Sequence, residues 1–464
     1  MQESGSSEAE GDMRFADLFA GLGGFHVALK RLGHECVFAS EIDDELRELY
    51  GRNFSDAAKV TSGDIRDNKD KVPPHDILCA GFPCQPFSKS GTQRGTLDNT
   101  RGTLFDEIVY ILQERRPEYV ILENVGNFER HDNGRTWRIV KESLEVLGYD
   151  VRGTEHVTTG GLGLISPHHL GYPHSRERFY VVARQGKLPS NPFPDIDRHR
   201  RTSLASIVQP ARELSRLDRE ETRLTESQRD CIEHWNSLLA ELPEDDVPLP
   251  SFPIWGDEID ATYPFEHYTP HVAPLAELRR CLNGHSSNDS ASNGAATRSQ
   301  LMDLLPNYAR VAEGEFPDWK IDFIRQNREW FRRYRDYFSD AWIEKLRTFP
   351  ASFRKLEWNC QGEDRDLWRH VLQFRPSGLR VKRYSTSPSL VAMTSTQIPI
   401  LGPKRRFLTR TEGLRLQGFG DDHKLPRSRE KTFNAPGNAV HVGVVEAIAK
   451  RLLNGTPEQP DLNE

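Results

Sequence analysis

Cys84 is the residue whose surroundings best suit nucleophilic chemistry. It lies in the run Ala80-Gly-Phe-Pro-Cys-Gln-Pro-Phe-Ser88, directly after the apolar stretch Asp76–Ala80, which is typical of a strand. A cysteine on a loop at the carboxyl end of a strand is placed for nucleophilic attack. Most single cysteines are small buried hydrophobic residues. The flanking prolines fix the backbone around Cys84 and favour the reactive interpretation.

A carboxylate and two arginines accompany this cysteine. Glu123 follows the apolar strand Tyr119–Leu122, and a half-buried glutamate with a raised pKa can share a proton with a ring nitrogen. Its alternative role is to cap the next helix. Arg176 and Arg178 precede another strand and alternate onto one face, where they could bind a phosphate or a base carbonyl. A solvated charged edge is the alternative for this pair.

A second set of residues suggests a nucleoside cofactor. The segment Phe15–Phe25 is a strand that runs into a glycine-rich turn and then a helix, so the backbone can approach a ligand closely. Its spacing is not G-x-G-x-x-G, which argues against a dinucleotide. Glu41, at the end of the next strand, could accept hydrogen bonds from ribose hydroxyls. Asp64 could bind an adenine amino group, with a turn or helix-cap role as its alternative.

The elements that must position these residues alternate between strand and helix. Such alternation predicts an α/β fold: a mainly parallel sheet covered on both faces, with ligands at the carboxyl ends of the strands. The expected strands are Arg14–Phe19, Cys36–Ser40, Asp76–Ala80, Tyr119–Leu122 and Phe179–Ala183, and the expected helices are His26–Leu32, Asp44–Asn53, Leu104–Gln113, Thr136–Leu147 and His441–Leu453.

The rhythm breaks after residue 184. Residues 186–350 are polar and contain proline-rich and Ser/Asn/Gly-rich stretches, and regular patterning returns near Phe374. We therefore expect a catalytic domain interrupted by a large insertion. The expected parts are a disordered tail (1–13), the first part of the catalytic domain (14–184), an insertion that forms a target-recognition domain (185–373), and the completion of the catalytic domain (374–464).

Composition limits the remaining possibilities. The net charge of -7 and pI near 6.2 are not those of a protein covered in basic surface. No apolar run is long enough for a membrane span, and no signal-peptide core is present. The six cysteines include no C-x-x-C pair, so we expect no metal site and an intracellular, cytoplasmic setting near the nucleoid.

With these residues the sequence closely resembles the DNA (cytosine-5)-methyltransferase family, and we expect a prokaryotic member. The resemblance covers about residues 14–184 and 374–453, and the motifs occur in the family's order. They are Asp17-Leu-Phe-Ala-Gly-Leu-Gly-Gly-Phe25, Gly81-Phe-Pro-Cys-Gln-Pro-Phe-Ser88, Arg101-Gly-Thr-Leu-Phe105, Glu123-Asn-Val125, the Arg176/Arg178 motif, Arg406–Phe419 and Gly437-Asn-Ala-Val440.

The resemblance implies a Rossmann-like domain that binds S-adenosylmethionine and a base flipped out of duplex DNA. Pro83 is implied to orient Cys84. The implied cofactor residues are Phe19, Gly21, Leu22, Gly24, Glu41, Ile42, Asp64, Ile65, Gly81, Leu104, Asn438 and Ala439. The stretch Ser88–Gly102 matches a loop that closes over DNA, and the implied DNA contacts on it and beside it are Gln85, Ser88, Lys89, Ser90 and Arg94.

The chemistry of the family uses the residues already singled out. Carbon 5 of cytosine is a poor nucleophile until the Cys84 thiolate adds to carbon 6. Protonation of N3 by Glu123 helps that addition, and Arg178 can bind the carbonyl oxygen. Departures from the family pattern occur at Ile42, His174, Ala435-Pro436 and His441, and none of them touches these three residues.

The insertion is expected to read the DNA sequence. Arg325, Arg328 and Arg332, with neighbouring arginines and aromatic residues in Trp319–Phe349, form a basic helical segment suited to phosphate contact. An ordinary amphipathic helix with its aromatic residues in a core is the alternative.

Two other functions remain open. A tRNA cytosine-5 methyltransferase is one, although that branch lacks a long recognition insertion; an inactive DNA-binding homologue is the other, although it would not need Cys84, Glu123, Arg176 and Arg178. We expect a monomer acting on double-stranded DNA, with no membrane or metal partner. We also expect a role beside a restriction or defence system without a stable complex.

Overall fold

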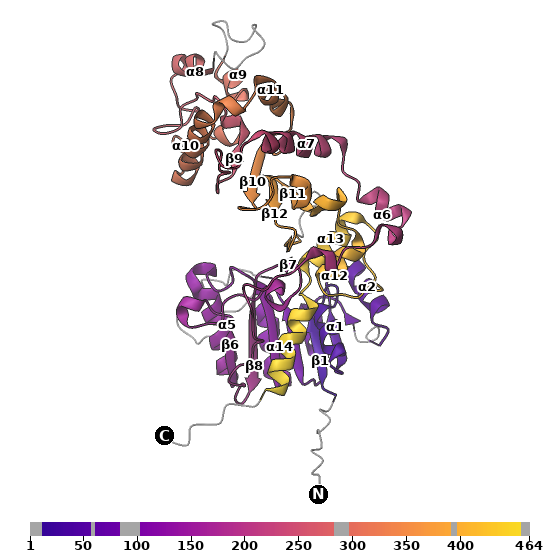
Figure 1. Cartoon of the computed structure of the whole chain (residues 1–464). Helices are drawn as coiled ribbons and strands as arrows, with labels where there is room; N and C mark the ends of the chain where they lie inside the picture. Colours follow the sequence, from indigo (N-terminus) through magenta and orange to yellow (C-terminus); the bar gives the residue numbers. More distant parts are fainter. Residues whose placement is uncertain (1–11, 57–60, 84–102, 283–296, 391–396, 456–464) are drawn as a thin grey trace. The chain divides into compact units, whose positions relative to one another are not determined.

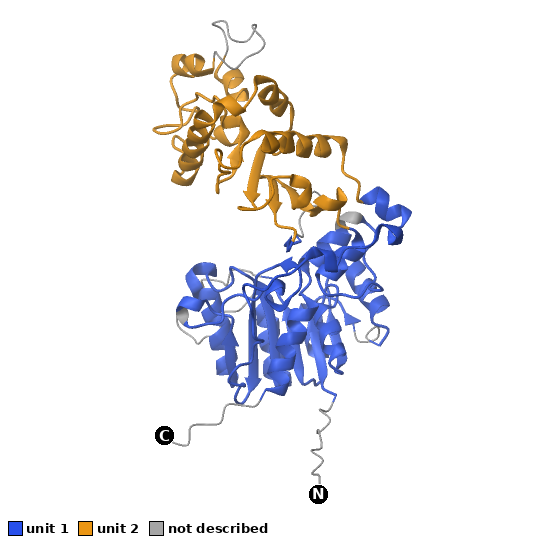
Figure 2. Ribbon diagram, in the orientation of Figure 1, with its two compact units in different colours: residues 1–221, 385–395, 409–464 blue, residues 222–384, 396–408 orange. Residues whose placement is uncertain are grey.

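The protein forms two compact units in its computed structural model. The structure describes residues 12–56, 61–83, 103–282, 297–390 and 397–455. Unit 1 comprises residues 1–221, 385–395 and 409–464, and unit 2 comprises residues 222–384 and 396–408 (Figure 2). Each unit has its own sheet.

Unit 1 is built on a seven-stranded sheet (Figure 1). Its order is β3-β2-β1-β4-β5-β8-β6, and all neighbours pair in parallel except β8, which is antiparallel to both β5 and β6. The expected mainly parallel α/β fold is therefore confirmed. The strands are β1 (Arg14–Leu18), β2 (Glu35–Ser40), β3 (Thr61–Ser62), β4 (Ile77–Gly81), β5 (Tyr119–Val125), β6 (Tyr149–Gly153) and β8 (Arg178–Gln185).

Helices cover both faces of this sheet because alternate strand residues point to opposite sides. In β4, Ile77 and Cys79 join one core cluster, whereas Leu78 and Ala80 join the other. The first cluster includes α1 (Gly24–Arg31), α2 (Asp44–Asn53) and α14 (Val442–Asn454); the second includes α3 (Ile65–Asn68), α4 (Leu104–Arg115) and α5 (Arg135–Val146). Because helices fill both faces of the sheet, a ligand can bind it at the strand ends.

The C-terminal part of the chain returns to complete unit 1. Its helices are α12 (Arg410–Leu416), α13 (Arg429–Asn438) and α14, which packs against α1. The short strands β7 (His174–Ser175) and β13 (Ser387–Pro388) pair in parallel. Segments more than 400 residues apart in the sequence thus share one core, as the late motifs had suggested.

Unit 2 contains a six-stranded sheet of order β15-β14-β11-β12-β10-β9. The strands are β9 (Ile254–Trp255), β10 (Lys355–Asn359), β11 (Val371–Arg375), β12 (Gly378–Lys382), β14 (Ile400–Leu401) and β15 (Arg406–Phe407). Its helices are α7 (Glu226–Glu241), α8 (Leu275–Leu282), α9 (Arg298–Asp303), α10 (Asp318–Arg333) and α11 (Asp340–Thr348).

The boundaries of the units differ from the expected boundaries of the insertion. The chain after residue 184 stays in unit 1 as far as 221, because Leu188 and Phe193 are buried in its core and α6 (Arg216–Glu221) follows there. The return to unit 1 comes at residue 385 rather than 374, because β11 and β12 form a hairpin of the unit 2 sheet.

No helix among the described residues is both long and apolar enough to cross a membrane.

Candidate active site

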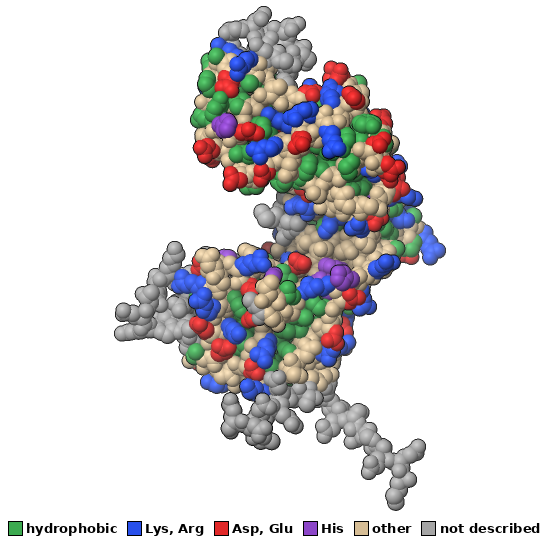
Figure 3. All heavy atoms as spheres, turned by 60° about the vertical axis from the view of Figure 1, so that its left-hand side comes forward, with side chains coloured by type: hydrophobic (Ala, Val, Ile, Leu, Met, Phe, Trp, Pro, Cys, Tyr) green, Lys and Arg blue, Asp and Glu red, His purple; other side chains and the backbone are tan. Residues whose placement is uncertain are grey.

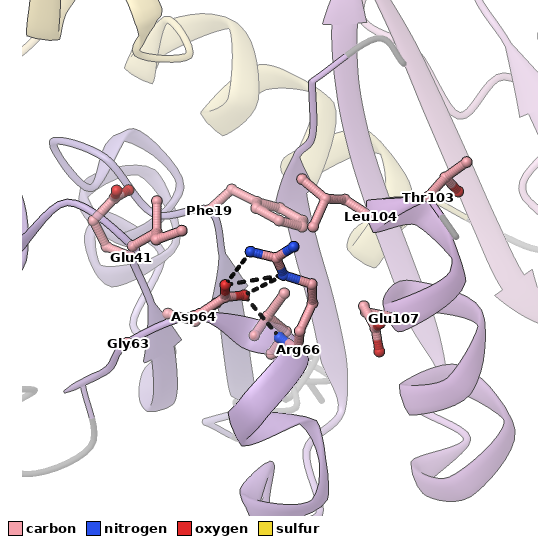
Figure 4. Close-up of a pocket in the computed structure, with 11 residues that line it drawn as sticks. Phe19, Glu41, Gly63, Asp64, Arg66, Thr103, Leu104 and Glu107 are labelled. Carbon is pink, nitrogen blue, oxygen red and sulfur yellow. Dashed lines mark hydrogen bonds and ion pairs between the residues drawn. The ribbon is translucent and has the colours of Figure 1, made fainter. Parts of the chain in front are cut away.

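A pocket lies at the carboxyl ends of the first strands of unit 1 (Figure 4). This strand-end pocket has a volume of about 440 Å³, within the range of small-molecule sites. Six of the expected cofactor residues line it: Phe19, Glu41, Ile42, Asp64, Ile65 and Leu104. They come from the ends of β1 and β2 and from the starts of α3 and α4. The parallel sheet thus gathers residues that are far apart in the sequence.

Glu41 is held in place before any ligand arrives. Its Oε2 accepts a hydrogen bond from the Gly21 N–H at 2.8 Å, and its Oε1 accepts one from the Asp43 N–H at 2.9 Å. The residue is 8% exposed. Each carboxylate oxygen has two lone pairs, so Glu41 keeps acceptor capacity for a pair of hydroxyl groups.

Asp64 is engaged by Arg66, a residue that the sequence did not single out. Its Oδ1 accepts from the Arg66 N–H at 3.0 Å and from Nε at 3.1 Å, and its Oδ2 accepts from Nε at 2.9 Å and from a terminal nitrogen. The expected helix-cap alternative is therefore present, since Asp64 precedes α3. The guanidinium lowers the pKa of Asp64. Figure 4 shows Arg66 turned onto Asp64 inside the pocket.

The glycine-rich turn brings the C-terminal motif close. Gly21 has φ 53°, a conformation that favours glycine. At Gly24 a Cβ atom would lie 2.6 Å from a Val440 methyl and 2.7 Å from its carbonyl oxygen. Gly24 is thus needed for packing rather than for lining the strand-end pocket. The same holds for Leu22, which is buried in the core.

The residues around the expected nucleophile are ordered by the neighbouring strand. Gly81 pairs in register with Glu123, and a Cβ atom there would lie 3.8 Å from the Glu123 carboxylate. The Asn124 side chain donates to the Phe82 carbonyl at 2.9 Å. Pro83 is exposed at the end of this segment. Cys84, Gln85, Ser88, Lys89, Ser90 and Arg94 lie outside the described residues.

Glu123 forms an ion pair with Arg178 across β5 and β8. The Arg178 Nε lies 2.9 Å from Glu123 Oε1, with the side chains 19% and 9% exposed respectively. Burial raises the pKa of Glu123, although Arg178 and Arg176 oppose the shift. A buried carboxyl with a raised pKa beside a fixed cation is suited to proton transfer.

Arg176 has a different position from Arg178. Its two terminal nitrogens donate to the carbonyl oxygens of Gly437 at 2.8 Å and Ala439 at 3.0 Å, and it is 3% exposed. Sequence reasoning placed Arg176 among the catalytic residues. These contacts tie the segment between β7 and β8 to the end of α13, and the catalytic role of Arg176 stays a prediction.

Asn438 and Ala439 lie at the end of α13, and neither lines the strand-end pocket. Asn438 ends α13 and is exposed, whereas Ala439 is buried. Two departures from the family pattern also meet here, since the rings of His174 and His441 lie 6.2 Å apart. Burial, then Arg176, lowers the pKa of His441 to about 3, so its ring is neutral at ordinary pH.

The arginines of α10 are less available than the sequence suggested. Arg328 lies 2.8 Å from the fully buried Glu258 and is 14% exposed, so its side chain is engaged within unit 2, and its expected role as a DNA contact stays a prediction. Arg325 pairs with Glu266 and Asp322 but is 54% exposed, and Arg332 is exposed. Trp330 and Phe331 are buried. The alternative of an amphipathic helix with an aromatic core face therefore describes α10.

Sequence reasoning also missed part of the strand-end pocket. Its further lining residues are Ser40, Gly63, Arg66, Thr103 and Glu107. Ser40 and Thr103 adjoin expected residues, so their neighbourhood was a usable signal. Glu107 is one helical turn beyond Leu104 and was accessible from helix periodicity. For Arg66 no such signal existed, because its side-chain direction depends on the local turn.

The domain is of the Rossmann-like α/β methyltransferase type: it has a mainly parallel sheet with β8 reversed, the strand-end pocket, and the buried Glu123 paired with Arg178 near the end of β5. The model of the family described as C-5 cytosine-specific DNA methylase matches residues 13–245 and 287–454. The chain belongs to this family, and the protein is a DNA cytosine-5 methyltransferase.

The chain is also similar to individual proteins. The chain is 33% identical to Type II methyltransferase M.AluI of Cellulosimicrobium cellulans, covering 96% of this chain and 92% of that protein. It is 43% identical to Type II methyltransferase M.HhaI of Haemophilus parahaemolyticus, covering 38% of this chain and 50% of that one. A solved Escherichia coli structure, a putative DNA modification methyltransferase encoded within a prophage, aligns at 18% identity over 96% of this chain and 99% of that one, with a TM-score of 0.45.

Proposed function

We propose that this enzyme methylates carbon 5 of a flipped cytosine within a short specific duplex sequence, as the modification partner of a restriction system. The observation that supports this proposal most strongly is the buried ion pair between Glu123 and Arg178. Glu123 pairs in register with Gly81, at the end of the strand that leads to Cys84. The Type II names of its relatives support the restriction–modification role. The proposed setting is the cytoplasm, near the nucleoid, with the enzyme acting as a monomer on DNA.

The strand-end pocket fits S-adenosylmethionine. Glu41, held at both oxygens, suits ribose hydroxyls, and the apolar side chains of Phe19, Ile65 and Leu104 suit an adenine ring. Asp64 offers an acceptor for the adenine amino group once Arg66 moves. Bound there, the cofactor supplies the methyl group as an electrophile. The fit rests on these hydrogen-bond acceptors and apolar surfaces together.

The chain's own residues supply the nucleophile and the proton transfers. The Cys84 thiolate forms a bond to carbon 6 of cytosine, and a proton from Glu123 to N3 takes up the electron density that the addition releases. Carbon 5 then carries the excess density and can accept the methyl group. Loss of the carbon 5 proton to a base from the solvent reforms the double bond between carbons 5 and 6 and expels the thiolate, and the N3 proton returns to Glu123. Arg178 orients Glu123 and can bind the base carbonyl.

Methylation mapping tests this function. Plasmid DNA from cells expressing wild type, Cys84→Ser or the control Cys281→Ser is sequenced after bisulfite treatment. We expect 5-methylcytosine in one short motif with wild type and the control, and none with Cys84→Ser. Methylation of cellular tRNA instead of plasmid DNA would establish the RNA alternative. Absence of methylation from both nucleic acids would support the inactive homologue.

A further inference from the structure

The segment after β8 carries a group of arginines onto unit 1. Residues 186–221 were expected to belong to the recognition insertion, but they pack in unit 1. Within them, Asp197-Arg-His-Arg-Arg201 supplies three exposed arginines in four residues. This stretch therefore lies in the same compact unit as β5 and β8, the strands that carry Glu123 and Arg178.

Two of these arginines lie against glycines of one loop. A Cβ atom at Gly163 would lie 2.6 Å from a terminal nitrogen of Arg198, and one at Gly171 would lie 3.0 Å from Nε of Arg200. Arg198 also donates to the Leu162 carbonyl at 2.6 Å. The guanidinium group of Arg198 is therefore held on the backbone of this loop and that of Arg200 lies beside Gly171, while both residues stay exposed. Seating of this kind reduces the entropy lost when an arginine binds a ligand.

A cavity of about 620 Å³ lies beside Arg198. Arg130 and His156 add basic groups to its wall, and Glu129 and Glu177 add acidic ones. Glu129 is partly engaged, since its Oε1 accepts from the His156 N–H at 3.1 Å. Among the described residues, no carboxylate lies within ion-pair distance of Arg130, Arg198 or Arg200, so these three cations are not neutralised by a salt bridge there.

The cavity adjoins the catalytic strands. Glu177, in its wall, stands between Arg176 and Arg178 in the sequence, and Gly126 follows β5 two residues after Asn124. The loop that carries Gly163 pairs with β8 through a bridge between Ile165 and Arg178. A nucleic-acid strand whose base reaches Glu123 would have its neighbouring phosphates near this edge.

We propose that Arg130, Arg198 and Arg200 form a phosphate-binding surface, here called the Arg198 surface, that holds the DNA backbone flanking the flipped cytosine. The net charge of the chain is -7, and basic and acidic side chains are interspersed on the face shown in Figure 3. DNA binding therefore depends on local groups of basic side chains rather than on the overall charge. The inference rests on the proposed function and adds a site to it. The surface contributes affinity without base specificity.

Paired charge removals test the proposal. The double variant Arg198→Ala/Arg200→Ala is compared with a control double variant, Arg14→Ala/Lys187→Ala. The control removes the same charge at the start of β1 and just after the end of β8, away from the Arg198 surface. Binding of a fluorescent duplex carrying the mapped motif is measured over a range of salt concentrations. For the test pair we expect affinity to fall about tenfold and the salt slope to fall by about 1 for each lost phosphate contact. Arg198→Lys should recover part of the loss.

Cofactor binding separates this role from a structural one. S-adenosylmethionine affinity and the denaturation midpoint should stay at wild-type values in the test pair. Equal losses of DNA affinity in test and control pairs would overturn the proposal, because net charge alone would then explain them. An unchanged salt slope, or a loss confined to cofactor affinity, would also overturn it. If wild type methylates no DNA, the proposed function itself fails, and this is seen before any variant is compared.

Discussion

Each unit of the protein contains a buried carboxylate paired with an arginine, and the two pairs have nearly the same length. In unit 1 Glu123 and Arg178 are 2.9 Å apart, and in unit 2 Glu258 and Arg328 are 2.8 Å apart. Glu258 also accepts hydrogen bonds from Tyr263 and Tyr308. Among the described residues, Glu123 pairs with Arg178 and with no second side chain.

The difference shows what separates a reactive acid from a structural one. Glu258 is fully buried among donors from three other segments, so its charge is satisfied and it fixes the packing of unit 2. Glu123 ends a strand beside the nucleophile segment and has a raised pKa because burial outweighs its arginine. A carboxyl near a strand end that has few hydrogen-bond donors around it can exchange a proton.

The largest effect that follows from this comparison is on catalysis. Glu123→Gln should lower kcat by about 10²- to 10⁴-fold, the usual contribution of a general acid, while S-adenosylmethionine affinity stays unchanged. Glu118→Gln, at the other end of the same strand and exposed, is the control. Single-turnover methylation of a mapped duplex measures both, and near-wild-type kcat in Glu123→Gln would remove Glu123 from the mechanism.

The raised pKa of Glu123 also predicts a pH dependence. The folded protein holds this proton more tightly than the unfolded chain, so the contribution to stability is full below the ordinary glutamate pKa. It is lost as pH rises through the higher folded value. Activity that needs the protonated acid should fall over the same rise. In Glu123→Gln this part of the pH dependence of stability should be absent. Denaturation of wild type and Glu123→Gln across that pH range measures it.

A smaller effect, on stability alone, is expected in unit 2. Arg328→Ala leaves Glu258 buried without its counter-charge and should lower the free energy of unfolding by about 3 kcal/mol. Arg332→Ala, on the exposed side of α10, should change it by less than about 0.5 kcal/mol. Urea denaturation of the full chain measures both. If Arg328→Ala weakens DNA binding without loss of stability, the structural assignment of this arginine is wrong.

The smallest effect concerns cofactor affinity. Arg66 occupies the acceptor positions of Asp64 that an adenine amino group needs, yet it is 59% exposed and so easily displaced. Arg66→Ala should therefore tighten S-adenosylmethionine binding by about two- to fivefold, the scale of a surface ion pair. Isothermal titration of wild type, Arg66→Ala and the control Arg52→Ala decides it. Weaker binding in Arg66→Ala would instead show that this arginine supports the bound adenine.

Much of unit 1 could be predicted because its signals are local. The sequence predicted α2 with its observed bounds, and the major strands to within a few residues, since apolar runs bounded by turns are visible in the chain itself. β6 was missed because its residues Tyr-Asp-Val-Arg-Gly alternate at the edge of the sheet and lack a buried run. The six expected residues of the strand-end pocket were found because their motifs fall at strand ends.

The family, the order of the motifs and the types of residue at the strand ends can be read from the sequence, because they depend on neighbours along the chain. The contacts of each arginine depend on tertiary packing. Arg176 binds backbone carbonyls more than 250 residues away, Arg328 pairs with a buried acid, and Arg198 lies against a glycine of unit 1. A long, charged side chain takes its role from the groups that packing brings within its reach, and those groups come from distant parts of the chain.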